Sequence, residues 1–139
     1  MNIGIAISHF QISNYASKED SWNYYGKLLP KPNKGLKNLS GENMEKLYKV
    51  LTLDGIIKNV RFSLNPSYVY EDGKINKEKV KEYKGFFEYL KNNSIDLLLV
   101  SIHFTYPISW GKIYSKEFLK NSIEFFEEIK EIFDYTNKI

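Results

Sequence analysis

The sequence predicts an α/β domain with parallel strands. A strand followed by a helix is indicated three times along the 139 residues. The last strand, predicted at 96–103, is an almost continuous apolar run, as is typical of a strand covered on both faces. Strands that alternate with helices of this length pair in parallel through right-handed crossovers. These observations define the fold class before any single residue is considered.

The first strand is predicted at 3–8, where small Gly4 and Ala6 interrupt the apolar side chains. The polar and aromatic connection that follows, 11–39, contains Pro30, Pro32 and Gly35. Connections of this length inside a compact domain are usually functional or poorly ordered.

Two helices are predicted from their caps. Ser40 is expected to cap the first helix, which runs to about Gly55, and Asn76 the second, which runs to about residue 92. Each cap is flanked by apolar residues spaced as a hydrophobic staple. A strand at 59–64 lies between the two helices and stops at an Asn-Pro pair. The residues expected to face the core recur at helical spacing: Met44, Leu47, Tyr48 and Leu51, then Val80, Tyr83, Phe86, Phe87 and Leu90.

The third strand leads through a loop at 104–114 to Ser115, where a last apolar helix begins. Three parallel strands have two open edges and, if all crossovers share one hand, one uncovered face. Parallel sheets are rarely stable in that state. The pattern therefore predicts part of a larger sheet or barrel. A complete small domain stays open if the long first loop covers the bare face.

Composition favours one folded domain spanning 1–139, with 42% hydrophobic residues. The chain has no cysteine, which excludes disulfides, thiolate metal sites and a cysteine nucleophile. The apolar run at the N-terminus is too short for a signal peptide or a membrane span and has no basic residues before it. We therefore expect a cytoplasmic location without membrane association.

The net charge of +3 invites a nucleic-acid interpretation. The lysines, however, alternate with glutamates at helical spacing, as in Glu42/Lys46 and Glu45/Lys49, and such pairs usually mark solvated helix faces. A single arginine provides few of the groups that proteins use to bind phosphates. No nucleic-acid partner is expected.

Two residues near strand ends are the strongest functional candidates. Arg61 is the single arginine beside nineteen lysines, and His103 closes the third predicted strand. A guanidinium can hold a carboxylate in two-point contact, which an ammonium cannot do. Polar residues at the carboxyl ends of successive parallel strands suggest a site. An ordinary surface arginine and a structural histidine remain the alternative.

Two further sets of residues are weaker candidates for a functional site. His9 and His103 both lie near strand ends, but no third ligand is suggested, so no metal and no cofactor are expected. Trp110 is equally consistent with stacking on a sugar ring and with a place in the core, whereas Trp22 favours the core.

Several segments resemble the N-terminal part of family 1 glycoside hydrolases, the β-glucosidase and β-galactosidase type. The opening at 3–13 is similar to F-G-x-A-T-S-x-x-Q-x-E-G, and 60–63 to x-R-F-S. Residues 73–76 with Tyr83 are similar to G-x-x-N-x-x-x-x-x-Y, and 93–107 to N-G-I-x-P-x-V-T-L-x-H-[FW]-x-x-P. The resemblance covers essentially the whole chain in order. The set R-F-S, G-x-I-N and H-F-x-x-P is its most specific part.

This resemblance implies the first three βα units of a (β/α)8 TIM-type barrel, an incomplete barrel. It also implies that Gln11 and His103 bind sugar hydroxyls and that Arg61 orients the nucleophilic carboxylate. Trp110 is the third sugar-binding candidate. An amide and an imidazole suit hydroxyl binding because both can donate and accept hydrogen bonds.

The sequence also departs from the family. Ser13 replaces a glutamate and Ser94 a glycine. Neither segment that carries the family's two catalytic glutamates is present, although a retaining glycosidase needs both carboxyl groups. Loop carboxylates such as Glu71 and Asp72 are read as solvated or capping residues, so the chain alone is expected to be inactive.

We therefore expect the N-terminal part of a β-glycosidase that binds a β-linked sugar and needs a complementary chain for catalysis. Two alternatives stay open. One is a non-catalytic carbohydrate-binding or scaffold protein that folds alone or self-associates. The other is a degenerate fragment without function.

Overall fold

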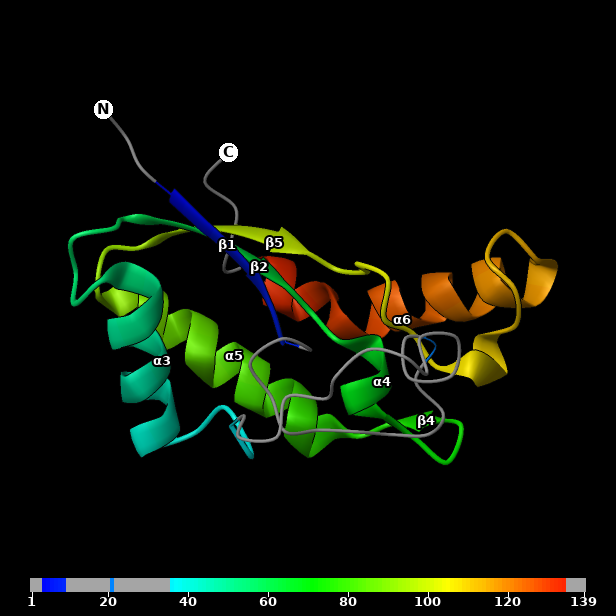
Figure 1. Ribbon diagram of the computed structural model, residues 1–139. Helices are drawn as coiled ribbons and strands as arrows, with labels where there is room; N and C mark the ends of the chain where they lie inside the picture. Colours follow the sequence, from blue (N-terminus) through cyan, green and yellow to red (C-terminus); the bar gives the residue numbers. More distant parts are fainter. Residues whose placement is uncertain (1–3, 10–20, 22–35, 135–139) are drawn as a thin grey trace.

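A computed structural model describes residues 4–9, 21 and 36–134. Within them, β1 (Gly4–Ser8), β2 (Asn59–Ser63) and β5 (Asp96–Val100) form a parallel sheet in the order β1-β2-β5. The helices α3 (Glu42–Thr52), α5 (Lys77–Asn92) and α6 (Lys116–Asp134) lie on one side of it (Figure 1). The predicted α/β class with parallel strands is confirmed, and the described residues form no closed barrel.

Of the two predicted helix caps, one is confirmed. The side chain of Asn76 accepts hydrogen bonds from the backbone N–H groups of Glu78 and Lys79 and so begins α5. Ser115 accepts one from Phe118 at the start of α6. The cap predicted at Ser40 is wrong: α3 begins one residue later, with Gly41 at its N-cap in the left-handed region (φ 50°) and no side-chain cap.

The segment between β2 and α5 contains more structure than its sequence predicts. Asn65 caps the short helix α4 (Pro66–Val69) by accepting a hydrogen bond from Ser67 N–H at 3.1 Å. A hairpin of β3 (Tyr70–Glu71) and β4 (Lys74–Ile75) follows. Its two turn residues both have positive φ, as a tight antiparallel turn requires.

The two faces of the sheet differ in cover. Val60 and Phe62 of β2 are buried against the helices, and Ile7 and Leu99 of the neighbouring strands pack with them. Side chains of the alternate positions point the other way, because successive residues of a strand face opposite sides. On that open face Ala6, Arg61 and Leu98 form one row across the three strands. Among the described residues no element covers this face, as the sequence predicts for this topology.

Burial of β5 differs from the sequence-based expectation. The strand ends at Val100 rather than at residue 103, and its Leu98 is 55% exposed. The apolar run predicted cover on both faces, which is wrong for the described structure. The apolar composition suits a strand that is covered on both faces, but the described helices cover only one face of β5.

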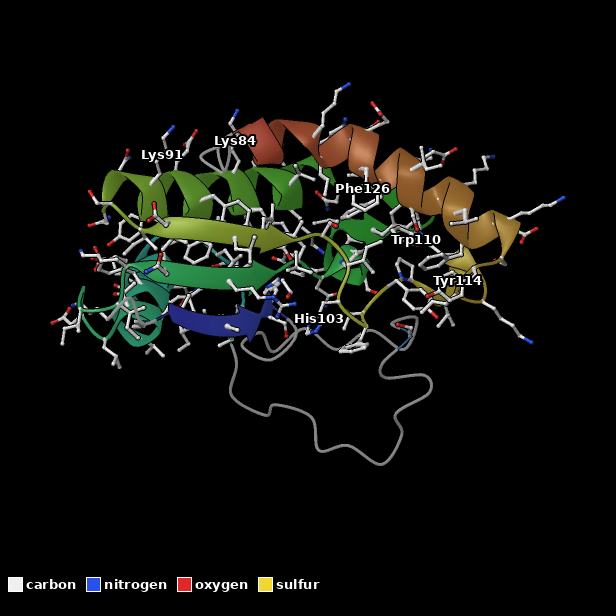
Figure 2. All side chains as sticks on the ribbon, turned by 90° about the horizontal axis from the view of Figure 1, so that it is seen from above. Lys84, Lys91, His103, Trp110, Tyr114 and Phe126 are labelled. Atoms are coloured by element: carbon white, nitrogen blue, oxygen red, sulfur yellow. The ribbon has the colours of Figure 1, made fainter. Side chains whose placement is uncertain are left out.

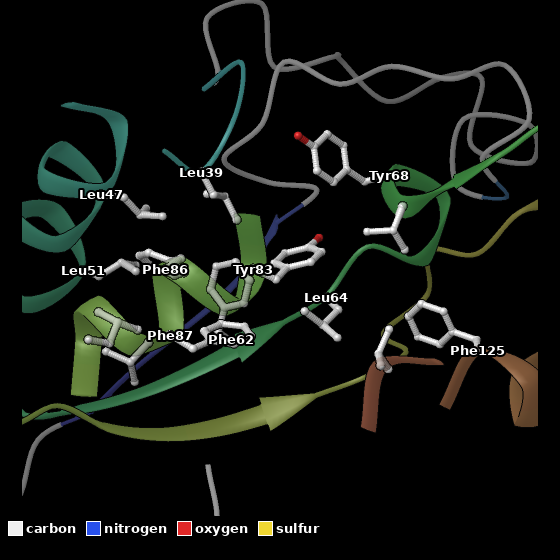
Figure 3. Packing of buried hydrophobic residues seen from close by; sticks show 14 of the residues in the cluster. Leu39, Leu47, Leu51, Phe62, Leu64, Tyr68, Tyr83, Phe86, Phe87 and Phe125 are labelled. Carbon is white, nitrogen blue, oxygen red and sulfur yellow. The ribbon is translucent and has the colours of Figure 1, made fainter. Parts of the chain in front are cut away.

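One hydrophobic core lies between the sheet and the helices (Figure 3). Phe62 is fully buried, with ring centroids 5.4 Å from Phe86 and 5.8 Å from Phe87 on α5. The buried residues predicted for α3 and α5 are confirmed, except that Val80 and two α3 residues are only partly buried. The core therefore fixes β2 against α5 and leaves the opposite face of the same strand free.

Candidate functional site

Arg61 lies in the middle of β2 on the open face, half-buried, opposite Ala6 on one side and Leu98 on the other. The ion pairs among the described residues all join a lysine to a glutamate, and none includes Arg61. Within the described structure, this arginine therefore lacks a carboxylate partner.

His103 follows β5 by three residues and is partly buried. Its ring lies 4.5 Å from that of Phe104, which is largely exposed and has a left-handed backbone (φ 67°). Figure 2 looks onto the open face and shows His103 beyond the carboxyl ends of the strands. Arg61 pairs with Leu98, which lies five residues before His103 in the chain. Arg61 therefore lies nearer the middle of the sheet than His103 does. The two residues share a side of the fold without direct contact.

Trp110 belongs to the core. It lies in the short 3₁₀ helix η1 (Ile108–Trp110) and is 1% exposed. Its ring packs edge-on against Tyr70 at 5.6 Å, and against Phe118 and Phe125 of α6. A tryptophan enclosed in this way anchors the loop after β5 to α6 and presents no face to a sugar in this arrangement.

A buried hydrogen-bonded chain lies at the end of β1. Asn65 donates its backbone N–H to the hydroxyl of Tyr83 at 3.1 Å, and that hydroxyl is hydrogen-bonded to Nδ1 of His9. His9 is 1% exposed and its ring lies edge-on to Tyr68. Burial, with a smaller contribution from the positive charge of Lys79, lowers the pKa of His9 to about 3. His9 is therefore a neutral structural residue that ties β1 to α5.

Among the described residues, three polar side-chain atoms near the carboxyl ends of the strands are buried without a hydrogen-bond partner. They are the Ser63 hydroxyl, the Asn65 amide nitrogen and the Thr105 hydroxyl. Buried polar atoms in native proteins are nearly always bonded, so such groups mark positions where water or a ligand could bind. Sequence reasoning did not single them out. The signal available was their place near strand ends: Ser63 is the last residue of β2, Asn65 follows two residues later, and Thr105 lies in the loop after β5.

Gln11 lies outside the described residues. Among the residues that are described, no group of three histidine, aspartate or glutamate side chains could hold a metal ion. No helix among them is long and apolar enough to cross a membrane. The carboxylate of Glu71 accepts hydrogen bonds from Lys79 and Asn76, which lower its pKa and give it a structural place in the hairpin.

A parallel sheet with helices on one face and an open opposite face has the layer arrangement of a barrel wall. Comparison with solved structures supports this class. A β-glycosidase from Pyrococcus horikoshii matches 93% of this chain with a TM-score of 0.69 and 26% identity. A GH1 β-glucosidase from the fungus Humicola insolens, in complex with glucose, also matches 93%, with a TM-score of 0.68 and 15% identity.

The resemblance to family 1 β-glycosidases is thereby confirmed, and the chain fits an N-terminal fragment of such an enzyme. It spans 31% and 30% of the two matching chains. No protein-family model matches the sequence, and neither does any curated protein.

Proposed function

We propose that this chain is the sugar-binding part of a β-glycosidase, corresponding to the first three βα units of the barrel. A complementary chain supplies the remaining units and both catalytic carboxylates. The observation that carries the proposal is the structural match, which covers 93% of this chain but 31% of the Pyrococcus horikoshii enzyme. Within the described residues one face and both edges of the sheet are open, which supports the proposal because barrel closure covers all three.

In this proposal Arg61 orients the nucleophilic carboxylate contributed by the complement. It is half-buried on the open face and has no carboxylate partner among the described residues. A guanidinium beside a carboxylate keeps it ionised and fixes its orientation through two parallel hydrogen bonds. A partly desolvated arginine gains most from such a partner.

His103 and Gln11 hold the sugar in the same proposal. An imidazole and an amide each offer a donor and an acceptor, so they can bind neighbouring ring hydroxyls. The unpartnered Ser63, Asn65 and Thr105 groups add polar atoms at the same end of the sheet. A retaining reaction further needs two carboxyl groups about 5–5.5 Å apart, and both come from the complement.

The test is reconstitution. The chain is co-expressed with the Pyrococcus horikoshii β-glycosidase from which the matching segment has been removed, and hydrolysis of nitrophenyl β-glucoside and β-galactoside is measured. We expect hydrolysis by the pair and none by either part. Failure of the pair to hydrolyse either compound, although it forms a folded complex, would sink the proposal.

Single substitutions then test the assigned roles. Arg61→Lys keeps the charge but loses the two-point contact, and we expect kcat to fall about 100-fold, as for other lost transition-state contacts. His103→Ala should lower kcat/KM by about 10–100-fold, since one hydrogen bond to substrate is lost. Lys58→Ala is the matched control, because Lys58 is an exposed cation just before the start of β2.

A second candidate is a non-catalytic carbohydrate-binding protein. One observation favours it: the core on the helix side is already closed by residues of this chain alone. It predicts a cooperatively folding chain that binds methyl β-glucoside without the complement and never hydrolyses it. Calorimetric titration of the isolated chain separates the two candidates.

A further inference from the structure

Ser21 joins two distant parts of the chain, the connection that follows β1 and the loop that follows β5. Its backbone N–H donates to the carbonyl oxygen of Tyr106 at 2.8 Å. Its hydroxyl accepts a hydrogen bond from Tyr106 N–H at 3.1 Å and donates one to the carbonyl oxygen of Phe104 at 2.9 Å. Ser21 is 2% exposed. We call these three hydrogen bonds the Ser21 clasp.

The Ser21 clasp has the pattern of a strand pair. In an antiparallel pair, two opposed residues exchange both of their backbone hydrogen bonds. Ser21 binds both backbone groups of Tyr106 in this way, but its hydroxyl oxygen takes the place of the second carbonyl. The hydroxyl proton is used on Phe104. Because buried backbone groups need partners, loss of the hydroxyl would leave one N–H and one carbonyl to find others.

The clasp holds a strained residue in place. Phe104 has a φ of 67°, and a bulky residue in the left-handed region persists only where its surroundings fix the backbone. Before it, β5 ends at Val100. After it, Tyr106 is anchored in the core, with its ring 5.1 Å from that of Phe118. Between these two anchors, the hydroxyl of Ser21 binds the carbonyl of the strained residue itself.

The conformation of Phe104 in turn affects the imidazole of His103. The two residues are consecutive, and their ring centroids lie 4.5 Å apart. If the backbone of Phe104 left the left-handed region, its ring would turn and the imidazole would lose this support. A hydrogen bond to a sugar hydroxyl depends closely on distance and angle, so a displacement of about 1 Å is enough to lose it.

We infer that Ser21 is a positioning residue for sugar binding. The clasp holds Phe104 in its left-handed conformation and thereby places His103 where it can bind a sugar hydroxyl. Ser21 acts through these two residues, because its own N–H and hydroxyl proton are both used within the protein. Since His103 binds a sugar only under the proposed function, this role of Ser21 rests on that proposal and deepens it.

Three variants separate positioning from stability. Ser21→Ala removes both hydrogen bonds of the hydroxyl, whereas Ser21→Thr keeps the hydroxyl. Thr52→Val is the matched control, because the buried Thr52 hydroxyl also binds one carbonyl and one N–H, those of Tyr48 and Gly55, at the end of α3. Urea denaturation should show similar losses of stability for Ser21→Ala and Thr52→Val. Only Ser21→Ala should change the site.

The first measurement is hydrolysis of nitrophenyl β-glucoside by the co-expressed complex. Ser21→Ala should lower kcat/KM about tenfold, as for one lost hydrogen bond to the sugar, with Ser21→Thr and Thr52→Val within about twofold of the parent. In a chain that already carries His103→Ala, Ser21→Ala should have no further effect, because residues that act through one contact are not additive. Additive losses, or equal losses in Ser21→Ala and Thr52→Val, overturn the inference and leave the proposed function intact.

The second measurement uses the isolated chain and does not depend on hydrolysis. The chain has two histidines, so its imidazole proton signals in an NMR spectrum are few, and His103→Ala identifies those of His103. The ring current of Phe104 shifts these signals, so Ser21→Ala should move them and Thr52→Val should not. Unchanged signals overturn the inference. A selective shift in a chain whose folded complex hydrolyses nothing supports the clasp and overturns the proposed function. If Ser21→Ala does not fold, Ser21→Cys takes its place in both measurements, since a thiol makes weaker hydrogen bonds.

Discussion

Phe62 and Arg61 are neighbours in β2, yet they lie in opposite environments. Phe62 is fully buried among the aromatic rings of α5, whereas Arg61 is half-buried on a face that no helix of the described chain covers. Because successive side chains of β2 point to opposite faces, one face of the sheet is part of the packed core and the other is left open by the described helices. The stability of this chain should therefore depend on the covered face and its proposed activity on the open face.

The largest effect is expected at the centre of the covered face. Phe62→Ala removes a ring that packs on Phe86 and Phe87, and leaves a cavity. Such truncations cost about 3–5 kcal/mol. Urea denaturation followed by circular dichroism measures the loss. A loss below about 1 kcal/mol would mean that the core on this side is not closely packed.

The stability of the chain should depend on pH through His9, which is buried at the end of β1. His9 has a pKa of about 3 in the folded chain, against 6.5 as its ordinary value, so the unfolded chain binds a proton that the folded chain does not. Stability is therefore fully present above pH 6.5 and falls as the pH drops towards 3. Between pH 8 and pH 5 the free energy of unfolding should fall by about 2 kcal/mol.

A variant identifies His9 as the source of this change. His9→Gln keeps a hydrogen-bonding group near Tyr83 but does not titrate, so its stability should vary less over the same interval. The interval stays above the ordinary pKa of 4.5 for Glu71, whose lowered pKa affects stability only at lower pH. An equal slope in both proteins would assign the change to other groups.

A smaller effect on stability is expected at the N-terminus of α5, one of the helices that cover the sheet. Asn76→Ala removes the side chain that bonds two N–H groups at the start of α5. Loss of such a cap costs about 1 kcal/mol. Asn76→Asp is the control, because it keeps the acceptor and adds a negative charge at the helix N-terminus. Thermal unfolding of the three proteins distinguishes a lost cap from a general disturbance.

The smallest effect on the isolated chain is expected on the open face. Leu98→Asn changes a side chain that is 55% exposed, so its free energy of unfolding should stay within about 0.5 kcal/mol of the parent. In the co-expressed complex the same residue becomes buried, and the yield of complex should fall severalfold. A strong loss of stability in the isolated chain would show that the open face is covered there.

The fold could largely be predicted from the sequence because its signals are local. The Asn76 cap, the apolar spacing of α5 and the Asn-Pro stop after β2 each act within a few residues. The extent of cover on β5 could not, because it depends on which elements pack on each face of the sheet. Helix α4 does have a local signal, the Asn65 cap followed by Pro66, but that pair was interpreted only as the end of a strand. The start of α3 was misplaced since Ser and Gly in succession both suit a cap.

The candidate site was less accessible to sequence reasoning. Arg61 and His103 were found from residue type and place at strands, but Trp110 shows how little type alone decides, since a tryptophan serves a core and a sugar site equally well. Ser63 and Thr105 become noticeable only when their burial without a partner is known. The role of His9 likewise required Tyr83, seventy-four residues away.

The edge of β5 that no described strand pairs with also bears on the solubility of the isolated chain. Natural edge strands are commonly guarded by lysine, proline or a bulge, but the run Leu97-Leu98-Leu99-Val100 has none of these and carries one charge only at its start, Asp96. A β-rich apolar segment of this kind is a template for aggregation. The same edge that would accept a partner strand should therefore also promote aggregation of the isolated chain, and more so at higher concentration.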